Sequence, residues 1–160
     1  MIENSTPIII NSAKACAVTG HRRGYEDLDK NKLKEVFISL INDGYDTFLV
    51  GMAIGFDTLC FKLLYHLKSE YDIKIVACIP CLDQNKNFSA SQNKEYLDML
   101  NKADFKVLVS KNYHSRCMMQ RNIYMVDNSS ILVACLRQDS GGTFNTVQYA
   151  KKVNKKIIYI

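Results

Sequence analysis

The chain has 160 residues, of which 48% are hydrophobic, and it carries a formal net charge of +5. Its length fits one compact domain spanning residues 1–160, because single domains commonly run to about 100–200 residues. No apolar run approaches the roughly 18 residues of a membrane span, and residues 1–12 lack the basic-then-apolar order of a signal peptide. We therefore expect a cytoplasmic protein that has no contact with a membrane.

The positive charge is scattered, apart from one dense group of lysines near the C-terminus. This group comprises Lys151, Lys152, Lys155 and Lys156. It lies at the end of a predicted helix, where cations complement the helix dipole, so a solvated face is the favoured interpretation. Non-specific binding of RNA or DNA is a minor alternative.

Six cysteines raise the question of disulfides, but four of them lie inside apolar strand or helix patterns. Free cysteine behaves there as a small core residue, which fits a reducing compartment. Cys78 and Cys81 have the spacing of a redox pair or of half a zinc site, yet no second Cys/His pair stands at a usable distance. We interpret them as a strand end and a turn, and we expect neither a metal nor a cofactor.

The N-terminal half begins with an apolar segment at residues 8–10, expected as an arm or an edge strand, and a first strand at residues 15–18. An amphipathic helix follows, with Asp29 as its predicted cap and Gly44 as its stop. Apolar residues 48–50 predict a second strand. The helical spacing of the apolar residues after Asp57 predicts the next helix.

Strands and helices continue to alternate in the second half. They are expected, in chain order, as a strand at 73–79, a helix around 95–102 after a polar stretch at 83–93, a strand at 105–109, a helix at 116–127, a strand at 131–136, a helix opened by 140–146 and a strand at 156–160. This alternation predicts βαβ crossovers, and hence an α/β fold with a doubly wound, mostly parallel sheet of about six strands and helices on both faces.

The turn after the second strand is a candidate anion site. Gly51 and Gly55 carry no side chains, so backbone N–H groups at the start of the next helix can face a ligand. Only two of the three dinucleotide-fingerprint glycines are present, and no Gly-Lys-Ser/Thr follows to make a P-loop. An ordinary tight turn with Asp57 as helix N-cap is therefore the alternative interpretation.

Two further turns should lie on the same edge of the sheet, because parallel strands share one direction and ligands bind at their carboxyl ends. After the first strand come Thr19, Gly20, His21 and Arg22, and after the fifth come Gly141, Gly142, Thr143 and Thr146. The second glycine pair lets backbone approach an anion, Thr143 is the predicted N-cap and Thr146 adds a donor. We predict one ligand site from these three turns.

Individual side chains in these turns suggest how a nucleotide would be held. Arg22, with Arg23 beside it, offers bidentate contacts to phosphate, and Asp57 can accept from a ribose hydroxyl. His21 is either a general base or, as we favour, a partner in a structural hydrogen bond. No catalytic residue is predicted.

Three residues on the helix before the fifth strand are weaker candidates. Arg116 and Arg121 are about 140° apart on a helix, so only one of them need face the ligand edge. Asn122 is either a ligand contact or a surface residue.

Four motifs together resemble the YpsA-like branch of the SLOG (DNA-processing protein/Lonely Guy) superfamily. They are Thr19-Gly20-His21-Arg22, Gly51-Met52-Ala53-x-Gly55-x-Asp57, Arg121-Asn122-x-x-Met125-Val126-Asp127 and Gly141-Gly142-Thr143-x-x-Thr146-Val147-x-Tyr149-Ala150. The resemblance covers nearly the whole chain and adds Met52 to the candidate ligand-binding residues. It implies a Rossmann-like fold, often oligomeric, whose glycine-rich turns bind nucleotides or nucleotide-derived molecules such as ADP-ribose derivatives.

Some members of this superfamily are cytokinin-activating phosphoribohydrolases, which use a Pro-Gly-Gly-x-Gly-Thr-x-x-Glu turn with a catalytic glutamate, helped by an arginine. This chain departs from that pattern, with Ser140 in place of the proline, Phe144 in place of the third glycine and Gln148 in place of the glutamate. A glutamine amide cannot ionise, so it can neither act as a carboxylate base nor stabilise an oxocarbenium ion by charge.

These observations predict a protein that binds a nucleotide or a nucleotide-derived signalling molecule, either ADP-ribose-like or a cyclic nucleotide, as a sensor or a sequestering protein. A homo-oligomer is expected from the resemblance. The first alternative is a nucleoside monophosphate phosphoribohydrolase. The second is a DNA- or RNA-binding module, as in the DNA-processing relatives.

Overall fold

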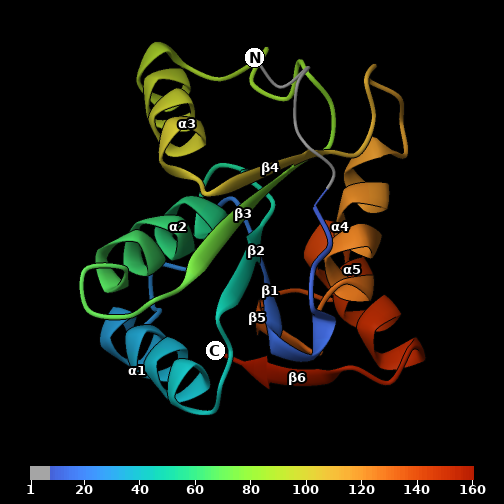
Figure 1. Ribbon diagram of the computed structural model, residues 1–160. Helices are drawn as coiled ribbons and strands as arrows, with labels where there is room; N and C mark the ends of the chain where they lie inside the picture. The colour runs from blue at the N-terminus through green and yellow to red at the C-terminus, as the bar shows by residue number, and fades with distance from the viewer. Residues whose placement is uncertain (1–7) are drawn as a thin grey trace.

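Strands and helices alternate along residues 8–160, the part of the chain that this computed structural model describes (Figure 1). The strands are β1 (Ala15–Gly20), β2 (Thr47–Val50), β3 (Lys74–Ile79), β4 (Phe105–Leu108), β5 (Ile131–Cys135) and β6 (Lys156–Tyr159). The helices are α1 (Lys30–Asn42), α2 (Phe56–Leu67), α3 (Ala90–Lys102), α4 (Cys117–Asp127) and α5 (Gly141–Lys152), and a 3₁₀ turn, η1 (Ser12–Lys14), precedes β1. None of the helices is long and apolar enough to cross a membrane, as far as the described residues go.

The six strands form one sheet in the order β4-β3-β2-β1-β5-β6. Every pairing between neighbours is parallel, which confirms the predicted doubly wound, Rossmann-like α/β fold. The chain runs outward from β1 to β4 and then crosses back through α4 to place β5 beside β1. The strand order therefore reverses between β1 and β5, and this switch point is where ligands bind in open α/β sheets.

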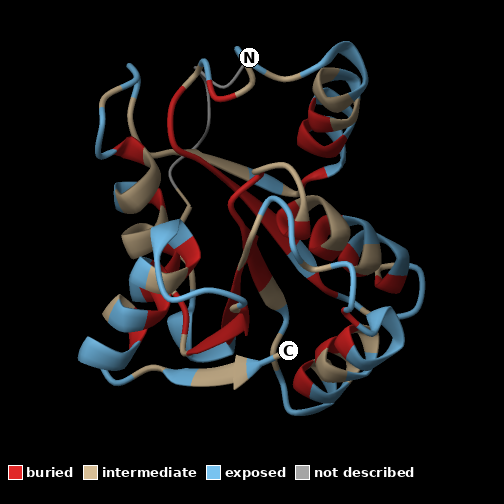
Figure 2. Cartoon of the chain, turned by 180° about the vertical axis from the view of Figure 1, so that it is seen from behind, coloured by how far each residue is buried: buried red, intermediate tan, exposed pale blue. Residues whose placement is uncertain are grey.

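Helices cover both faces of the sheet, with α1, α2 and α3 on one side and α4 and α5 on the other (Figure 1). Successive residues of a strand point to opposite faces. In β1, accordingly, Cys16 and Val18 pack toward α1–α3, and Ala15 and Ala17 pack toward α4 and α5. Figure 2 shows the consequence: the strands at the centre are buried, and exposed residues lie on the outer sides of the helices, in the loops and on the edge strand β6.

At the glycine turns, two helices begin earlier than the sequence predicts. Asp29 caps α1 as predicted, but Gly55 rather than Asp57 occupies the N-cap position of α2, and Ser140 rather than Thr143 occupies that of α5. Gly55 has φ 89°, a left-handed conformation that favours glycine, so the chain reverses there and the helix starts before Asp57. The predicted cap Thr143 and the alternative interpretation of Asp57 as a cap were therefore both wrong, since both residues lie inside the first helical turn and are buried.

The segment before β1 is not a strand. Residues 8–11 form no regular element, so the predicted edge strand is wrong for them, and residues 1–7 lie outside the described residues. Ile8 and Ile10 instead pack against the core beneath α4 and α5, as an arm would. Hydrophobic contact with that face replaces backbone pairing at a sheet edge.

The start of α3 and the state of the cysteines also follow from local sequence. Helix α3 begins earlier than expected, because Ser89 and Gln92 form a capping box that satisfies the backbone at its start. All six cysteines are free and buried, as predicted for the four that lie in apolar strand or helix patterns.

The packing of α2 on β1 yields the first prediction. A Cβ atom on Gly20 would lie 2.3 Å from Cδ1 and Cγ of Phe56, the fully buried first residue of α2. We expect Gly20→Ala to lower the free energy of unfolding by about 1–3 kcal/mol, as overpacking does. Gly142→Ala is the matched control, because no atom beyond its chain neighbours and its own helix backbone lies within 4 Å of its added Cβ. Urea unfolding measures both, and equal stabilities of the two variants would contradict the packing argument.

Candidate functional site

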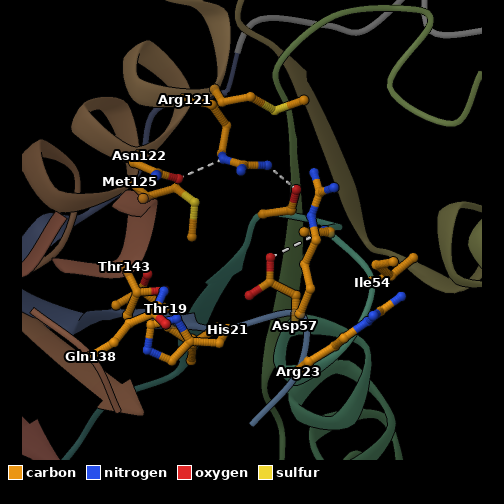
Figure 3. A pocket seen from close by; sticks show the side chains of 17 residues that line it. Thr19, His21, Arg23, Ile54, Asp57, Arg121, Asn122, Met125, Gln138 and Thr143 are labelled. Carbon is orange, nitrogen blue, oxygen red and sulfur yellow. Dashed lines mark hydrogen bonds between the residues drawn. The ribbon is translucent and has the colours of Figure 1, made fainter. Parts of the chain in front are cut away.

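A cavity of about 680 Å³ opens at the carboxyl edge of the sheet, around the switch point between β1 and β5 (Figure 3). This volume lies within the range of about 300–1,000 Å³ that is usual for small-molecule sites. The end of β1, the β2–α2 turn, one side of α4 and the start of α5 supply its walls. The lining residues are Val18, Thr19, Gly20, His21, Arg22, Arg23, Gly51, Ala53, Ile54, Asp57, Met118, Arg121, Asn122, Met125, Gln138, Gly142 and Thr143.

Most of the sequence-predicted site residues line this cavity. They are Thr19, Gly20, His21, Arg22, Gly51, Asp57, Arg121, Asn122, Gly142 and Thr143. The fold thus brings together three turns that are far apart in the sequence. That these residues bind a ligand stays a prediction.

Five predicted residues are absent from this lining. Met52 has φ 63°, and its side chain is fully buried in the core below α1–α3. Gly55 lies against the backbone of Arg22, where a Cβ atom would come within 2.5 Å of the Arg22 carbonyl oxygen. The Thr146 hydroxyl donates to the carbonyl of Gly142 at 2.7 Å and so supports α5 from within.

The other two residues lie at helix starts. Arg116 is exposed at the N-cap of α4, so Arg121 is the arginine that faces the ligand edge. Gly141 is exposed and has φ 89°, so its contribution is the turn into α5.

Arg121 is held in place by backbone and side-chain oxygens. It is only 5% exposed. Its Nε donates to Oδ1 of Asn122 at 2.7 Å, and a terminal nitrogen donates to the carbonyl of Gly51. Burial lowers the pKa of Arg121, but a guanidinium keeps its charge in proteins, so the site contains a fixed cation.

The absence of a side chain at Gly51 leaves the space that the Arg121 guanidinium occupies. A Cβ atom on Gly51 would lie 2.8 Å from Cζ of Arg121 and 2.9 Å from one of its terminal nitrogens. Any larger residue would push the guanidinium out of its position. Gly51 is therefore required by close packing with Arg121, whereas the sequence alone suggests that it exposes backbone to an anion.

Asp57 places a buried carboxylate in the same cavity. Its Oδ2 accepts from the backbone N–H of Ala53 at 3.1 Å, and the residue is 7% exposed. Burial raises the pKa of Asp57 to about 6, against the opposing effects of Arg121, the Ala53 N–H and Arg22. Figure 3 shows the carboxylate and the Arg121 guanidinium both directed into the cavity.

His21 connects the two central strands at the switch point. Its Nε2 accepts from the backbone N–H of Arg137 at 2.9 Å, which joins the turn after β1 to the turn after β5. Burial lowers the pKa of His21, and the charge of Arg137 lowers it further, so the neutral ring acts as an acceptor. This confirms the favoured interpretation of His21 as a partner in a structural hydrogen bond.

Sequence reasoning missed several lining residues that carried usable signals. Met118 and Met125 lie three or four residues from Arg121 and Asn122, so the helical period places them on the same face of α4. Gln138 lies in the short segment between β5 and the predicted glycine turn. Ile54 carried no such signal, because its position depends on the conformation of the β2–α2 turn.

Comparison with known proteins gives the family. Residues 18–159 match the family model described as the YspA SLOG family. The chain belongs to the YspA SLOG family. This confirms the resemblance to the YpsA-like branch that the four motifs predicted. Among relatives, the chain is 34% identical over 137 residues to the uncharacterized SPbeta prophage-derived protein YoqJ of Bacillus subtilis, covering 77% of this chain and 80% of that protein.

Solved structures of other proteins share the fold of this SLOG family member. DNA processing protein A (DprA) from Streptococcus pneumoniae superposes with a TM-score of 0.69 at 16% identity, covering 92% of this chain and 50% of that one. DprA from Helicobacter pylori, whose structure describes a single-stranded DNA binding mode, superposes with a TM-score of 0.67 at 15% identity, covering 93% of this chain and 66% of that one. At these identities the likeness shows a common fold, and the chain spans one half to two thirds of the DprA chains.

The buried carboxylate yields a prediction about pH. The pKa of Asp57 is about 6 in the folded protein against 3.8 for the free group, so the fold favours the protonated form. Stability is therefore lost as pH rises from about 4 to about 6, by roughly 3 kcal/mol in total. Asp57→Asn removes this loss and keeps an acceptor for Ala53, so its advantage over the native protein should be larger at pH 7.5 than at pH 4. Urea unfolding at both pH values tests this, with the exposed Asp43→Asn as control. An advantage independent of pH would contradict it.

Proposed function

We propose that this protein binds a nucleotide-derived molecule at the carboxyl edge of its sheet, through a phosphate group of the ligand. The observation that carries the proposal is the convergence of two anion-binding features on one cavity. The first is the buried, oriented guanidinium of Arg121. The second is the start of α5 at Gly142 and Thr143, where backbone N–H groups lack partners within the helix.

The geometry at Gly142 suits a close approach by phosphate. Apart from its chain neighbours and the backbone of its own helix, nothing lies within 4 Å of the position that a Cβ atom would occupy there, and the residue lines the cavity. Arg22 and Arg23 add exposed cations at the rim. A guanidinium binds phosphate through two parallel hydrogen bonds, so these side chains complement the helix N-terminus.

Asp57 supplies the acceptor that a sugar needs. A carboxylate has only acceptor oxygens, and one of the two is engaged by Ala53. The other oxygen would accept from a ribose hydroxyl while the phosphate lies against the cations. A ligand that combines phosphate and ribose therefore matches the charges of the cavity, and an ADP-ribose-like or cyclic nucleotide is the class we propose.

The biological role we propose is that of a sensor or a sequestering protein, acting as a homo-oligomer. The two roles demand different affinities. Sequestration of a signal present at about 1 µM needs a dissociation constant well below that value, and hence more than roughly 8 kcal/mol of binding free energy. Recovery of intact ligand at nanomolar affinity supports sequestration, and micromolar affinity supports sensing.

Single-stranded nucleic acid is the second candidate ligand. The observation that favours it is the fold shared with H. pylori DprA, whose structure describes a single-stranded DNA binding mode. A polynucleotide would place several phosphates on cations, so its affinity would fall steeply with salt. Small-molecule affinity that changes little between low and high salt, without binding of an oligonucleotide, favours the first proposal.

A substitution on α5 tests phosphate binding. Gly142→Val should weaken binding of ADP-ribose at least about tenfold, or about 1.4 kcal/mol, because the new side chain occupies the space next to the helix N-terminus. Gln148→Val is the matched control, because Gln148 is exposed on the same helix and does not line the cavity. Isothermal calorimetry measures affinity and circular dichroism the fold. Unchanged affinity in a folded Gly142→Val protein would defeat the proposal.

A second test addresses hydrolysis. Asp57 is the one acidic residue among the described residues that line the cavity, whereas glycosidic hydrolysis ordinarily uses a pair of carboxylates. We expect neither the native protein nor Gln148→Glu to release free base from AMP, CMP or GMP, as followed by chromatography. Turnover on the order of 1 s⁻¹, an ordinary enzymatic rate, would instead establish the phosphoribohydrolase alternative.

A further inference from the structure

A second cavity, of about 450 Å³, adjoins the one described above. The two cavities share Arg22, Ile54 and Met118 as a common wall. The remaining walls of the second cavity come from the loop after β3, residues 81–88, and from Tyr113 in the loop after β4. The polar stretch that the sequence shows between β3 and α3 thus lies beside the proposed ligand site.

The loop at residues 81–88 is firmly folded. Backbone hydrogen bonds from Lys86 to Asp83 at 3.0 Å and from Phe88 to Asn85 at 3.1 Å close successive turns within it. The ring of Phe88 packs edge-on against Tyr96 of α3 at 5.6 Å between centroids. Hydrogen bonds and aromatic packing therefore fix the loop that forms the walls of the second cavity.

One carbonyl group fixes the two cavities relative to each other. Gln84 Nε2 donates to the carbonyl oxygen of Gly51 at 3.1 Å, and the same oxygen accepts from Arg121. Gln84 is 8% exposed, and its own Oε1 has no hydrogen-bond partner among the described residues. The wall of the second cavity thus contains a buried hydrogen-bond acceptor, Gln84 Oε1, that no described residue satisfies.

The linings of the two cavities differ in chemistry. No Phe or Tyr is among the described residues that line the first cavity, which instead carries the cations and the carboxylate that suit phosphate and sugar. The second contains Phe88 and Tyr113, and beside them Asn87 and the charged side chains of Asp83 and Lys86. Aromatic faces with hydrogen-bonding groups beside them are the features that bind a nucleobase.

We propose that the ligand spans both cavities, with its base in the second cavity and a phosphate-linked ribose in the first. Arg22, which belongs to the common wall, then lies where a connecting pyrophosphate passes. This inference rests on the proposed function and narrows the ligand class to nucleoside diphosphate sugars of the ADP-ribose type. A ligand confined to the first cavity would leave the aromatic residues of the second unused.

The test compares ligands and variants by calorimetry. ADP-ribose should bind the native protein at least about a hundredfold more tightly than ribose 5-phosphate, because only ADP-ribose reaches the second cavity. Tyr113→Ala should weaken ADP-ribose binding about tenfold, the order of one base-stacking contact. Tyr113 is 65% exposed, so its removal leaves the core intact. Tyr159→Ala, which removes another exposed tyrosine, is the matched control and should bind as the native protein does.

The outcomes separate this inference from the function on which it rests. If the native protein binds neither ADP-ribose nor ribose 5-phosphate, the proposed function fails and this inference fails with it. If ADP-ribose binds but Tyr113→Ala and Asn87→Ala bind it as tightly as the native protein, the two-cavity ligand alone is overturned. Equal affinities for ADP-ribose and ribose 5-phosphate would overturn it as well.

Discussion

The carbonyl oxygen of Gly51 is the point on which the candidate site depends. It lies just beyond the end of β2, and it accepts hydrogen bonds from Arg121 of α4 and Gln84 of the loop after β3. A backbone carbonyl has two lone pairs, so both donors can be satisfied at once. Three segments that are remote in sequence thereby share one anchor, and the guanidinium gains an orientation that a solvent-exposed arginine lacks. The missing side chain at this position is what lets the arginine come so close.

The burial of Arg121 and Asp57 in one cavity has a clear energetic meaning. Removing a charge from water costs several kcal/mol unless hydrogen bonds and opposite charges compensate. Here the compensation is partial: the carboxylate receives one backbone N–H bond, and its pKa still rises to about 6. The rest of the fold therefore supports a carboxylate whose burial is only partly compensated. Buried ionisable groups with a perturbed pKa that line a cavity are characteristic of functional sites.

Much of the fold was predictable because apolar runs and helical spacing are local signals, and the alternation of strands and helices fixes the class of sheet. The gathering of the three turns was predictable as well, since parallel strands share one edge. What failed was the local detail within those turns. Met52 points into the core because its backbone is left-handed, and Thr143 is buried because α5 begins at Gly141. Neither conformation follows from residue type alone.

The other site residues could not be predicted because their positions depend on long-range contacts. The helical period separates Arg116 from Arg121 without saying which one faces inward, because the phase of α4 is set by its packing on the sheet. Gln84 sits in a polar stretch with no motif, and its partner Gly51 is 33 residues away. Side-chain to backbone bonds of this length leave no pattern in a single sequence. The second cavity therefore cannot be predicted from the sequence, because it depends on the conformation of the loop after β3.

The position of β1 has a consequence for how the site comes into existence. β1 pairs on one side with β2, which follows after one helix, and on the other with β5, more than a hundred residues further along the chain. Pairings between distant segments are slow to form, because a long loop must close before its contacts are made. The turn after β1 and the start of α5 meet only when β1 and β5 are paired. The walls of the cavity are therefore brought together only in the completed sheet, so the candidate site is a property of the whole sheet and of no single segment.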